Sequence, residues 1–205
     1  MQAVESENLI LYHTDLRGQW PQDAARALSA RLPYGKRLAT AAEGPEARAT
    51  LAGIALALRA LTALTGRAVG AGEIVFAQGQ KPRLAGAEHT DERRTPCPDF
   101  SISHSGPWVG CAALTGARVG FDVEMGSGAR IANWVAREAA LKACGAGIGA
   151  LREVRLSAGR ASCRGELWYA QALELFPGAA ACVMTSLPVQ ELAAHALSLE
   201  ELFAS

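Results

Sequence analysis

The apolar segment RVGFDVE ends in two acidic residues, Asp122 and Glu124. Residues two apart in an extended strand point to the same face, so both carboxylates would be aimed at one place. Two such carboxylates repel each other unless a cation lies between them, and sites with oxygen ligands alone suit Mg²⁺, with Mn²⁺ as the alternative ion. The pair predicts a divalent-cation site, although a solvated strand end would contain the same residues.

A second pair of charged residues falls in the segment IANWVAREAALKACG. Glu138 and Lys142 are one helical turn apart, so they share a helix face. The carboxylate would serve as a third metal ligand or as a general base, and the ammonium would hold a phosphate. The alternative is an ordinary ion pair between neighbours on a helix. Trp134, one turn earlier, is expected to pack in the core.

Polar residues are unusually dense in the segment FSISHSGPW. An extended backbone places Ser101, Ser103 and Ser105 on one side and His104 with Ile102 on the other. Serine hydroxyls and a histidine donor at a strand end are suited to binding phosphate oxygens. A turn that carries a surface histidine is the competing interpretation.

Four further cations are candidates for an anion site: Arg48, Lys81, Lys36 and Arg37. Each is also the kind of residue that ordinarily lies in solvent at a protein surface. Arg48 differs because it opens a strongly apolar helical segment, where a cation opposes the helix dipole unless an anion is nearby.

Helices and strands must position these residues, and hydrophobic periodicity indicates where in the sequence such elements lie. A short helix is expected over residues 21–32, followed by a basic, flexible-looking stretch over 31–37. A long helix is expected over 46–66, with Gly66 as its stop. Further helices are expected over 131–145, with Gly145 at the end, and over 198–203.

Alternating and β-branched segments predict strands over 74–77, 99–105, 108–114, 118–124, 151–157, 165–175 and 179–186. Residues 85–98 are charged and rich in turn formers, which predicts an exposed loop. The strands over 108–114 and 118–124 are separated by a turn at Thr115 and Gly116 and are expected to form an antiparallel pair. Helices and strands interleave without a regular βαβ rhythm, so the expected fold class is α+β.

The composition narrows the class of protein. Half of the 205 residues are hydrophobic, so the chain can bury one large core or two smaller ones. Lys and Arg together number 20, as do Asp and Glu, which argues against a general nucleic-acid binder and makes any anion site local. The dispersed cysteines, the acidic start and the lack of an apolar run long enough for a membrane span predict a reduced, soluble, cytoplasmic protein.

Four motifs occur in order between Lys81 and Gly147: QKPRL, FSISHSGPWV, GFDVE and WVAREAALKACGAGI. Together they resemble the successive signatures of the 4′-phosphopantetheinyl transferases, in the class that includes the surfactin-synthetase-activating enzyme. The resemblance is confined to this part of the chain, with looser agreement at Arg48. Members of the family move the phosphopantetheine arm of coenzyme A to a serine of an acyl or peptidyl carrier protein and release adenosine 3′,5′-bisphosphate.

The resemblance implies a role for each residue that matches a family motif. Three acidic residues would hold Mg²⁺, and one of them would also be the base. The other matches would contact coenzyme A at its pyrophosphate, at a further phosphate or at its nucleotide end. The implied roles are metal binding for Asp122, Glu124 and Glu138, base for Glu138, pyrophosphate contact for Lys142, coenzyme A contacts for Ser103 and His104, and nucleotide contacts for Lys81 and Arg48. Lys36 and Arg37 fall roughly where relatives hold further phosphate-binding cations.

The resemblance also implies a fold and a set of partners. The family fold is a pair of similar α+β halves related by a pseudo-two-fold axis, with the site between them. In this chain the halves would be residues 1–114, with the nucleotide-binding side, and residues 115–205, with the metal and the catalytic helix. The implied partners are coenzyme A and an apo carrier protein, with no nucleic acid and no membrane, and the expected state is a monomer.

The chain departs from the family pattern between Glu124 and Trp134, where only MGSGARIAN intervenes. Relatives carry a longer stretch there that helps to receive the carrier protein, so a non-catalytic coenzyme A-binding protein of the same fold is one alternative. Hydrolysis of coenzyme A or a related nucleotide is another, because water would then replace the carrier serine. Arg137 stands where the motif usually has lysine, and Ser101 where it usually has asparagine; neither is an expected metal ligand.

Overall fold

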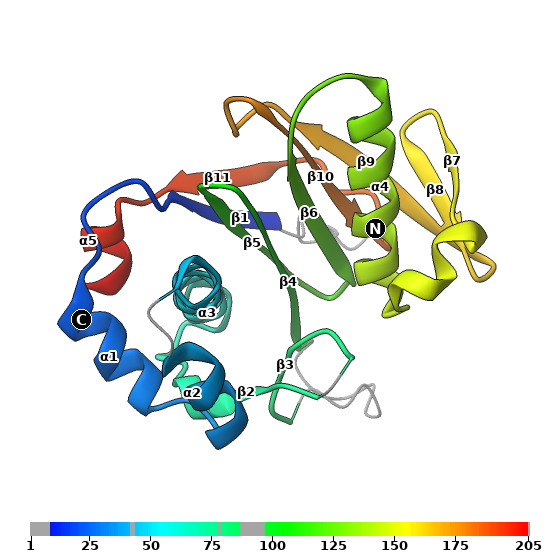
Figure 1. The fold of residues 1–205 in the computed structure, drawn as a ribbon. Helices are drawn as coiled ribbons and strands as arrows, with labels where there is room; N and C mark the ends of the chain where they lie inside the picture. Colours follow the sequence, from blue (N-terminus) through cyan, green and yellow to red (C-terminus); the bar gives the residue numbers. More distant parts are fainter. Residues whose placement is uncertain (1–8, 42–43, 78, 87–96, 205) are drawn as a thin grey trace.

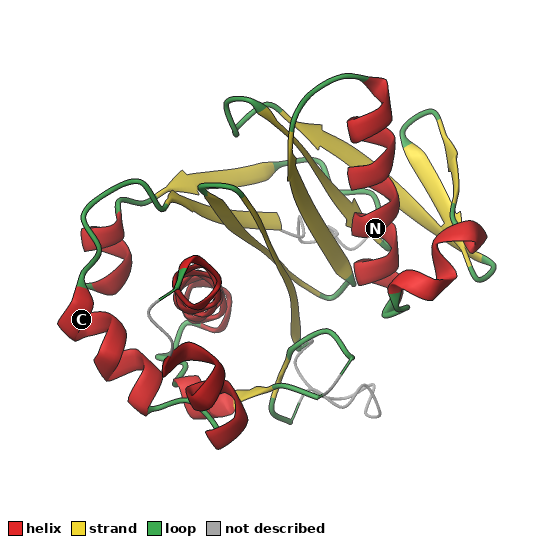
Figure 2. Ribbon diagram, in the orientation of Figure 1, coloured by secondary structure: helices red, strands yellow, loops and turns green. Residues whose placement is uncertain are grey.

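The computed structural model describes residues 9–41, 44–77, 79–86 and 97–204. Within them the chain has an α+β fold, in which two main sheets each carry a long helix on one face (Figure 1 and Figure 2). The helices are α1 (Gln22–Ala30), α2 (Tyr34–Ala41), α3 (Pro45–Thr65), α4 (Ala129–Cys144) and α5 (Leu199–Phe203), with 3₁₀ turns at Ala71–Glu73 and Ile148–Glu153. The strands are β1 (Leu9–Asp15), β2 (Ile74–Val75), β3 (Arg83–Leu84), β4 (Pro98–Ser105), β5 (Trp108–Thr115), β6 (Val119–Met125), β7 (Arg155–Ser157), β8 (Arg160–Cys163), β9 (Glu166–Leu173), β10 (Ala179–Thr185) and β11 (Leu192–Ala196).

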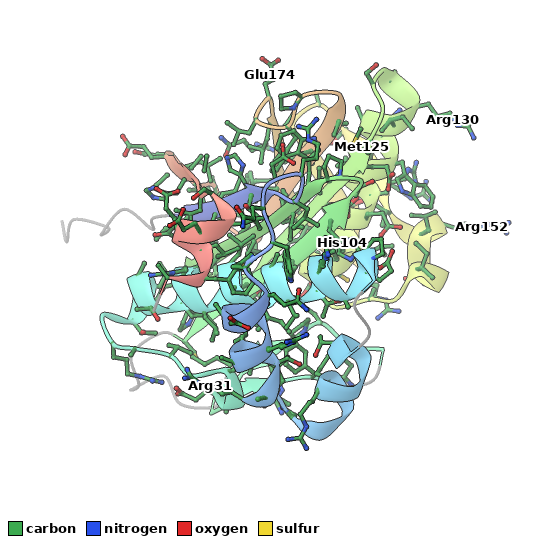
Figure 3. The ribbon with its side chains drawn as sticks, turned by 60° about the vertical axis from the view of Figure 1, so that its left-hand side comes forward. Arg31, His104, Met125, Arg130, Arg152 and Glu174 are labelled. Carbon is green, nitrogen blue, oxygen red and sulfur yellow. The ribbon has the colours of Figure 1, made fainter. Side chains whose placement is uncertain are left out.

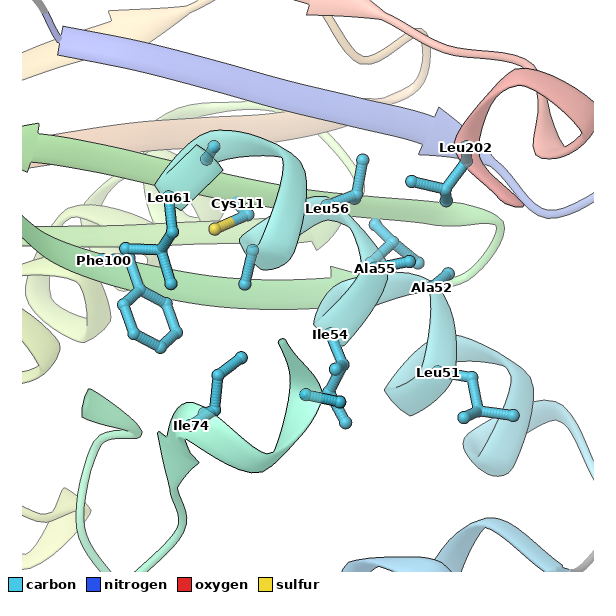
Figure 4. Close-up of a cluster of buried hydrophobic side chains, with 14 of the residues drawn as sticks. Leu51, Ala52, Ile54, Ala55, Leu56, Leu61, Ile74, Phe100, Cys111 and Leu202 are labelled. Atoms are coloured by element: carbon cyan, nitrogen blue, oxygen red, sulfur yellow. The ribbon is translucent and has the colours of Figure 1, made fainter. Parts of the chain in front are cut away.

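The first sheet has the strand order β11-β1-β5-β4 and is antiparallel except between β1 and β11. α3 lies across one face of this sheet, and α1, α2 and α5 pack around α3 (Figure 1). Figure 4 shows side chains of α3, among them Leu61, in one buried cluster with Phe100 and Cys111 of the sheet. Burial of this apolar surface holds α3 in place, and α3 in turn carries Arg48 on its first turn.

The expected long helix over 46–66 is confirmed as α3, which ends at Gly66 in the left-handed conformation with φ of 66°. By length and composition alone α3 is able to cross a membrane, which the sequence analysis did not expect. However, 61% of its most apolar window is buried inside the protein. α3 therefore has the environment of a core helix in a soluble fold.

The second sheet has the strand order β6-β10-β9-β8-β7 and is antiparallel throughout. α4 packs across β6 and β10 (Figure 1). Helix and strand approach closely because β6 has Gly120 at their contact, where an added Cβ would lie 2.0 Å from the carbonyl oxygen of Ala139. Gly120 therefore fixes the distance between β6 and the helix that carries Glu138 and Lys142.

The two sheets meet where their edge strands β4 and β6 run beside each other as members of different sheets. Side chains of β4 provide hydrogen-bond acceptors at this seam: the Phe121 amide donates to the Ser101 hydroxyl (3.0 Å), and the Met125 amide donates to the Ser105 hydroxyl (3.1 Å). Both bonds join residues 20 positions apart, so the two strands run in the same direction. The predicted serine face of β4 is thus the surface that joins the sheets.

The expected antiparallel pair of strands over 108–114 and 118–124 is wrong. β5 lies between β1 and β4, whereas β6 pairs with β10 in the other sheet. The two strands contact each other through side chains instead: the Phe121 ring packs over Gly110, where an added Cβ would lie 2.6 Å from a ring carbon. The turn at Thr115 and Gly116 therefore leads from one sheet into the other.

Other local expectations also need correction. The stretch over 31–37 contains the start of α2 rather than an irregular segment. The strand over 74–77 is limited to β2, and the strand over 151–157 divides into a 3₁₀ turn and β7. β1, β3, β8 and β11 have no counterpart among the expected strands. Trp134, which was expected in the core, is 40% exposed, because the buried residues of α4 begin only at Val135 and the two residues before Trp134 are exposed as well. Most of the expected loop over 85–98 lies outside the described residues.

The expected division of the chain near residue 115 stays a prediction, next to which the membership of the two sheets is as follows. β1, β4 and β5 belong to the first sheet, and β6 to β10 make up the second. The last part of the chain does not follow the division, because β11 pairs with β1 and α5 packs against α3. The end of the chain therefore returns to the first half.

Candidate functional site

Asp122 and Glu124 lie at the end of β6, on the face that Gly120 presents to α4. Asp122 is 5% exposed, and its Oδ1 accepts hydrogen bonds from Ser103 Oγ (2.7 Å) and Lys142 Nζ (2.8 Å). Glu124 is less buried and accepts a hydrogen bond from Ser105 Oγ (2.8 Å). The structure therefore brings three predicted site residues, Asp122, Lys142 and Ser103, into direct contact.

Glu138 completes the acidic cluster, which we define as Asp122, Glu124, Glu138 and Lys142. Burial raises the pKa of the Glu138 carboxyl, and the charge of Asp122 raises it further. Lys142 lowers this pKa without offsetting the increase, and Glu124 adds a smaller increase. The carboxylates of the cluster thus act on one another across a partly buried space, where an additional cation would be stabilised.

Glu138→Gln should stabilise the metal-free protein at alkaline pH. A carboxyl whose pKa is raised by folding binds its proton more tightly in the folded state. The folded protein therefore loses stability as the pH rises above 4.5, the ordinary pKa of a glutamate. Glutamine does not ionise and avoids this loss. Melting temperatures in EDTA should favour the variant at about pH 8, and the difference should disappear below about pH 4. A difference that does not change with pH would contradict the raised pKa.

The carboxylates of the cluster are of the chemical type that binds a small divalent cation. Carboxylate oxygens are the ligands that Mg²⁺ prefers, and the hydrogen bonds of Asp122 engage only its Oδ1, leaving Oδ2 for another partner. Among the described residues, no three His, Cys, Asp or Glu side chains are close enough to form a metal site by themselves. Lys142 holds the position next to Asp122 in this arrangement. The metal role of Asp122, Glu124 and Glu138 stays a prediction.

Two cavities lie beside the first turns of α3, and one of them reaches the end of β4. One has a volume of about 560 Å³ and is lined by His104 and Gly106 from the end of β4 and by Arg48 from α3. The other, of about 270 Å³, lies between α1, α2 and α3. Arg48 lines both cavities and stacks over the Trp20 ring at 5.5 Å from its centroid. Arg48 is thus common to the two cavities, which we together call the arginine groove.

The arginine groove has the chemistry of a polyanion site. Arg26 and Arg37 line its smaller cavity together with Arg48. His104 lies at its larger cavity, with Nε2 3.9 Å from the Glu46 carboxylate on the first turn of α3 (Figure 3). Guanidinium groups present several donors to phosphate oxygens, so three of them around one cavity suit a ligand with several phosphates.

Trp20 and Arg26 are residues of the groove that the sequence analysis missed. Nothing in the spacing of residues 20–26 relates them to Arg48. They come together because α1 folds against α3, which is a tertiary contact. The sequence did identify other residues of this surface: Arg48, as the cation at the start of an apolar helix, and the candidates Arg37 and His104.

Two of the predicted cations lie elsewhere. The Lys36 ammonium lies over the Phe76 ring, 5.0 Å from its centroid. Lys81 Nζ donates to the Asp99 carboxylate (2.5 Å), and burial lowers the pKa of this lysine. Asp99 and His104 are separated along β4 by about 16 Å, at roughly 3.3 Å per residue. The structure does not bring Lys81 together with His104, and Lys81 instead contributes to the seam between the sheets.

Ser103 and His104 connect the acidic cluster to the arginine groove. They are neighbours in β4, and strand geometry directs them to opposite faces: Ser103 contacts Asp122, and His104 lines the cavity with Arg48. At this position β4 therefore has the acidic cluster on one face and the arginine groove on the other. In comparisons with known proteins, no family model matches the chain, and a search of curated proteins finds no match.

Proposed function

We propose that this protein transfers the 4′-phosphopantetheine arm of coenzyme A to a serine of an acyl or peptidyl carrier protein. The observation that carries the proposal is that neighbouring residues of β4 contact the two candidate sites: Ser103 contacts the acidic cluster, and His104 lines the arginine groove. Coenzyme A is polyanionic, and a chain with no net charge must bind it where cations are concentrated. The two helix-covered sheets that meet at one seam support assignment to the phosphopantetheinyl-transferase fold.

The proposed reaction is a displacement at the phosphorus that bears pantetheine. The serine Oγ of the carrier forms a new bond to this phosphorus, and the bond from the phosphorus to the bridging oxygen of the diphosphate breaks. The electron pair leaves with that oxygen, which releases adenosine 3′,5′-bisphosphate. The arginine groove would position the nucleotide end, so that the diphosphate extends toward Lys142.

Glu138 is the proposed base that accepts the serine proton. Its pKa is raised by burial and by Asp122, which makes it a stronger proton acceptor than an exposed glutamate. It lies one helical turn before Lys142 on α4, so base and phosphate clamp are carried by one rigid element. The proton taken from serine would reside on the Glu138 carboxyl at the end of the step.

Lys142 would contact the diphosphate by exchanging partners. Its ammonium already donates to Asp122, Ser103 and the Ile102 carbonyl. A phosphate oxygen at this position would replace one of these acceptors and keep the charge paired. Mg²⁺, held by Asp122, Glu124 and Glu138, would supply neutralisation of the diphosphate charge when bound.

A cavity of about 590 Å³ beside the acidic cluster is the route that we propose for the carrier protein. It is lined by Glu124 of the cluster, by Met125 and Trp134, and by Arg130 and Arg152. Met125 and Trp134 are each 40% exposed, and the arginines would complement an acidic partner. The proposed setting is the cytoplasm, which suits the five free cysteines, and the proposed state is a monomer.

A non-catalytic coenzyme A-binding protein of the same fold is the second candidate. Its support is the connection from β6 to α4, which consists of residues 126–128 alone, since Ala129–Asn133 already belong to the helix. The longer stretch that relatives use to receive a carrier has no room in this connection. Both candidates predict coenzyme A binding, and they differ in whether a carrier is modified.

Intact mass spectrometry of several purified apo carrier proteins should separate the two candidates. After incubation with this protein, coenzyme A and Mg²⁺, we expect at least one carrier to gain the mass of phosphopantetheine, and EDTA to prevent the gain. Coenzyme A binding without any gain would favour the non-catalytic protein. Release of adenosine 3′,5′-bisphosphate in the absence of carrier would instead indicate hydrolysis.

A further inference from the structure

Two cysteines from different elements are in contact at the end of the helix that carries Glu138 and Lys142. Cys144 is the last residue of α4, and Cys163 is the last residue of β8. Their sulfur atoms are 3.2 Å apart, with the Cys163 thiol donating to Cys144. Formation of a disulfide would require the sulfurs to approach by only about 1 Å, since an S–S bond is roughly 2.05 Å long.

The two thiols differ in their access to solvent. Cys144 is partly exposed, whereas Cys163 is fully buried. Burial raises the pKa of the Cys163 thiol to about 12, with the hydrogen bond to Cys144 as the next cause. Cys163 therefore rests as a protonated thiol at neutral pH, and Cys144 is the sulfur that a reagent from solvent meets first.

We propose that Cys144 and Cys163 form a reversible thiol-modification site, which a hydroperoxide converts to an intramolecular disulfide. The inference rests on the contact between the two sulfurs and does not depend on the proposed function. The other three cysteines lack this arrangement: Cys97, Cys111 and Cys182 show no sulfur partner among the described residues.

The chemistry proceeds in two balanced steps. The Cys144 sulfur attacks the distal oxygen of the hydroperoxide, the O–O bond breaks, and the products are a sulfenic acid on Cys144 and an alcohol, or water when the reagent is hydrogen peroxide. The Cys163 sulfur then attacks the Cys144 sulfur, the S–O bond breaks, and hydroxide leaves with the Cys163 proton as water. A dithiol reductant reverses the change by thiol–disulfide exchange and is itself oxidised.

The disulfide would tether the end of α4 to β8. Cys144 lies two positions after Lys142, and the buried face of α4 packs on the same sheet that contains β8. The linked residues are 19 positions apart, so the bond would restrict a loop of the unfolded chain. The oxidised protein should therefore be the more stable form, with a melting temperature higher by about 6 °C or more.

The test is oxidation of the full chain by a small excess of hydrogen peroxide, followed by intact mass and peptide mapping without reductant. We expect the mass to fall by two hydrogen atoms and the mapped link to join Cys144 to Cys163. The melting temperature should rise, and both changes should be reversed by dithiothreitol. Cys144→Ser and Cys163→Ser should each abolish the link and the rise, whereas Cys97→Ser, a partly exposed cysteine elsewhere, should keep both.

Several outcomes would overturn the proposal. They are a wild-type mass unchanged by peroxide, a gain of oxygen atoms on Cys144 without a link, or a link that joins other cysteines. A serine variant that is less stable under reducing conditions does not affect these readouts, because the mapped link in the wild-type chain is decisive by itself.

Discussion

Asp122→Asn should lower the rate of phosphopantetheine transfer about a thousandfold, which corresponds to roughly 4 kcal/mol in the activation barrier. The substitution removes one charge while keeping the size of the side chain. The asparagine amide oxygen would still accept the hydrogen bond from Ser103, but Lys142 would lose the anion that now positions its ammonium at 2.8 Å. A metal ligand of the proposed site would also be weakened, since carbonyl oxygens bind Mg²⁺ less strongly than carboxylates.

Transfer rates, coenzyme A affinity and melting temperature should be measured together for this variant. Glu174→Gln is the matched control, because it removes one carboxylate from an exposed position directly after β9, which Figure 3 labels. The control should transfer at the wild-type rate. Wild-type transfer by a folded Asp122→Asn protein would remove the acidic cluster from the mechanism, and loss of folding would be detected by the melting temperature.

The sequence was most informative where local rules determine the structure. The long apolar stripe of α3, the left-handed glycines after α3 and α4, and the alternation of β4 were all readable before the fold was known. The common face of Asp122 and Glu124, and the helical spacing of Glu138 and Lys142, were also readable. These local patterns are enough to bring the acidic cluster together once β6 and α4 pack.

The sequence was least informative where partners are distant in the chain. β11 pairs with β1 although the two strands lie near opposite ends of the sequence. β6 pairs with β10 and not with β5, which precedes it in the sequence. Neither pairing can be predicted from the composition of one strand, because strand pairing depends on which surfaces the rest of the fold buries. The same limit explains why α1 and Trp20 were not associated with Arg48.

The serines of β4 show how a correct pattern received an incomplete interpretation. Their common face was predicted, and they were assigned to phosphate binding as if that face were open. In the structure, Ser101 and Ser105 accept amide hydrogens of β6, and Ser103 contacts Asp122. A side chain that is hydrogen-bonded to the protein is less available to a ligand. The predicted coenzyme A contact of Ser103 would therefore require it to share its hydroxyl with Lys142.

Gly120→Ala should destabilise the protein by about 4 kcal/mol or more, a large share of the stability of a typical domain. The added Cβ would lie 2.0 Å from the Ala139 carbonyl oxygen and 2.4 Å from the Ala143 amide nitrogen. Both are backbone atoms of α4, so no side-chain rotation relieves the overlap. The helix itself must move away from β6, and that movement opens the apolar contact between α4 and its sheet.

The same displacement should disable the site. Asp122 follows Gly120 on the same face of β6, and Lys142 lies within the part of α4 that the new methyl group would push away. Denaturant unfolding should show a lower midpoint, and any folded fraction should bind coenzyme A weakly. Gly149→Ala is the matched control, since an added Cβ there meets no atom within 4 Å. Equal midpoints for the two variants would mean that α4 is not held against β6 by this close approach, and the packing that joins the two halves of the acidic cluster would need another explanation.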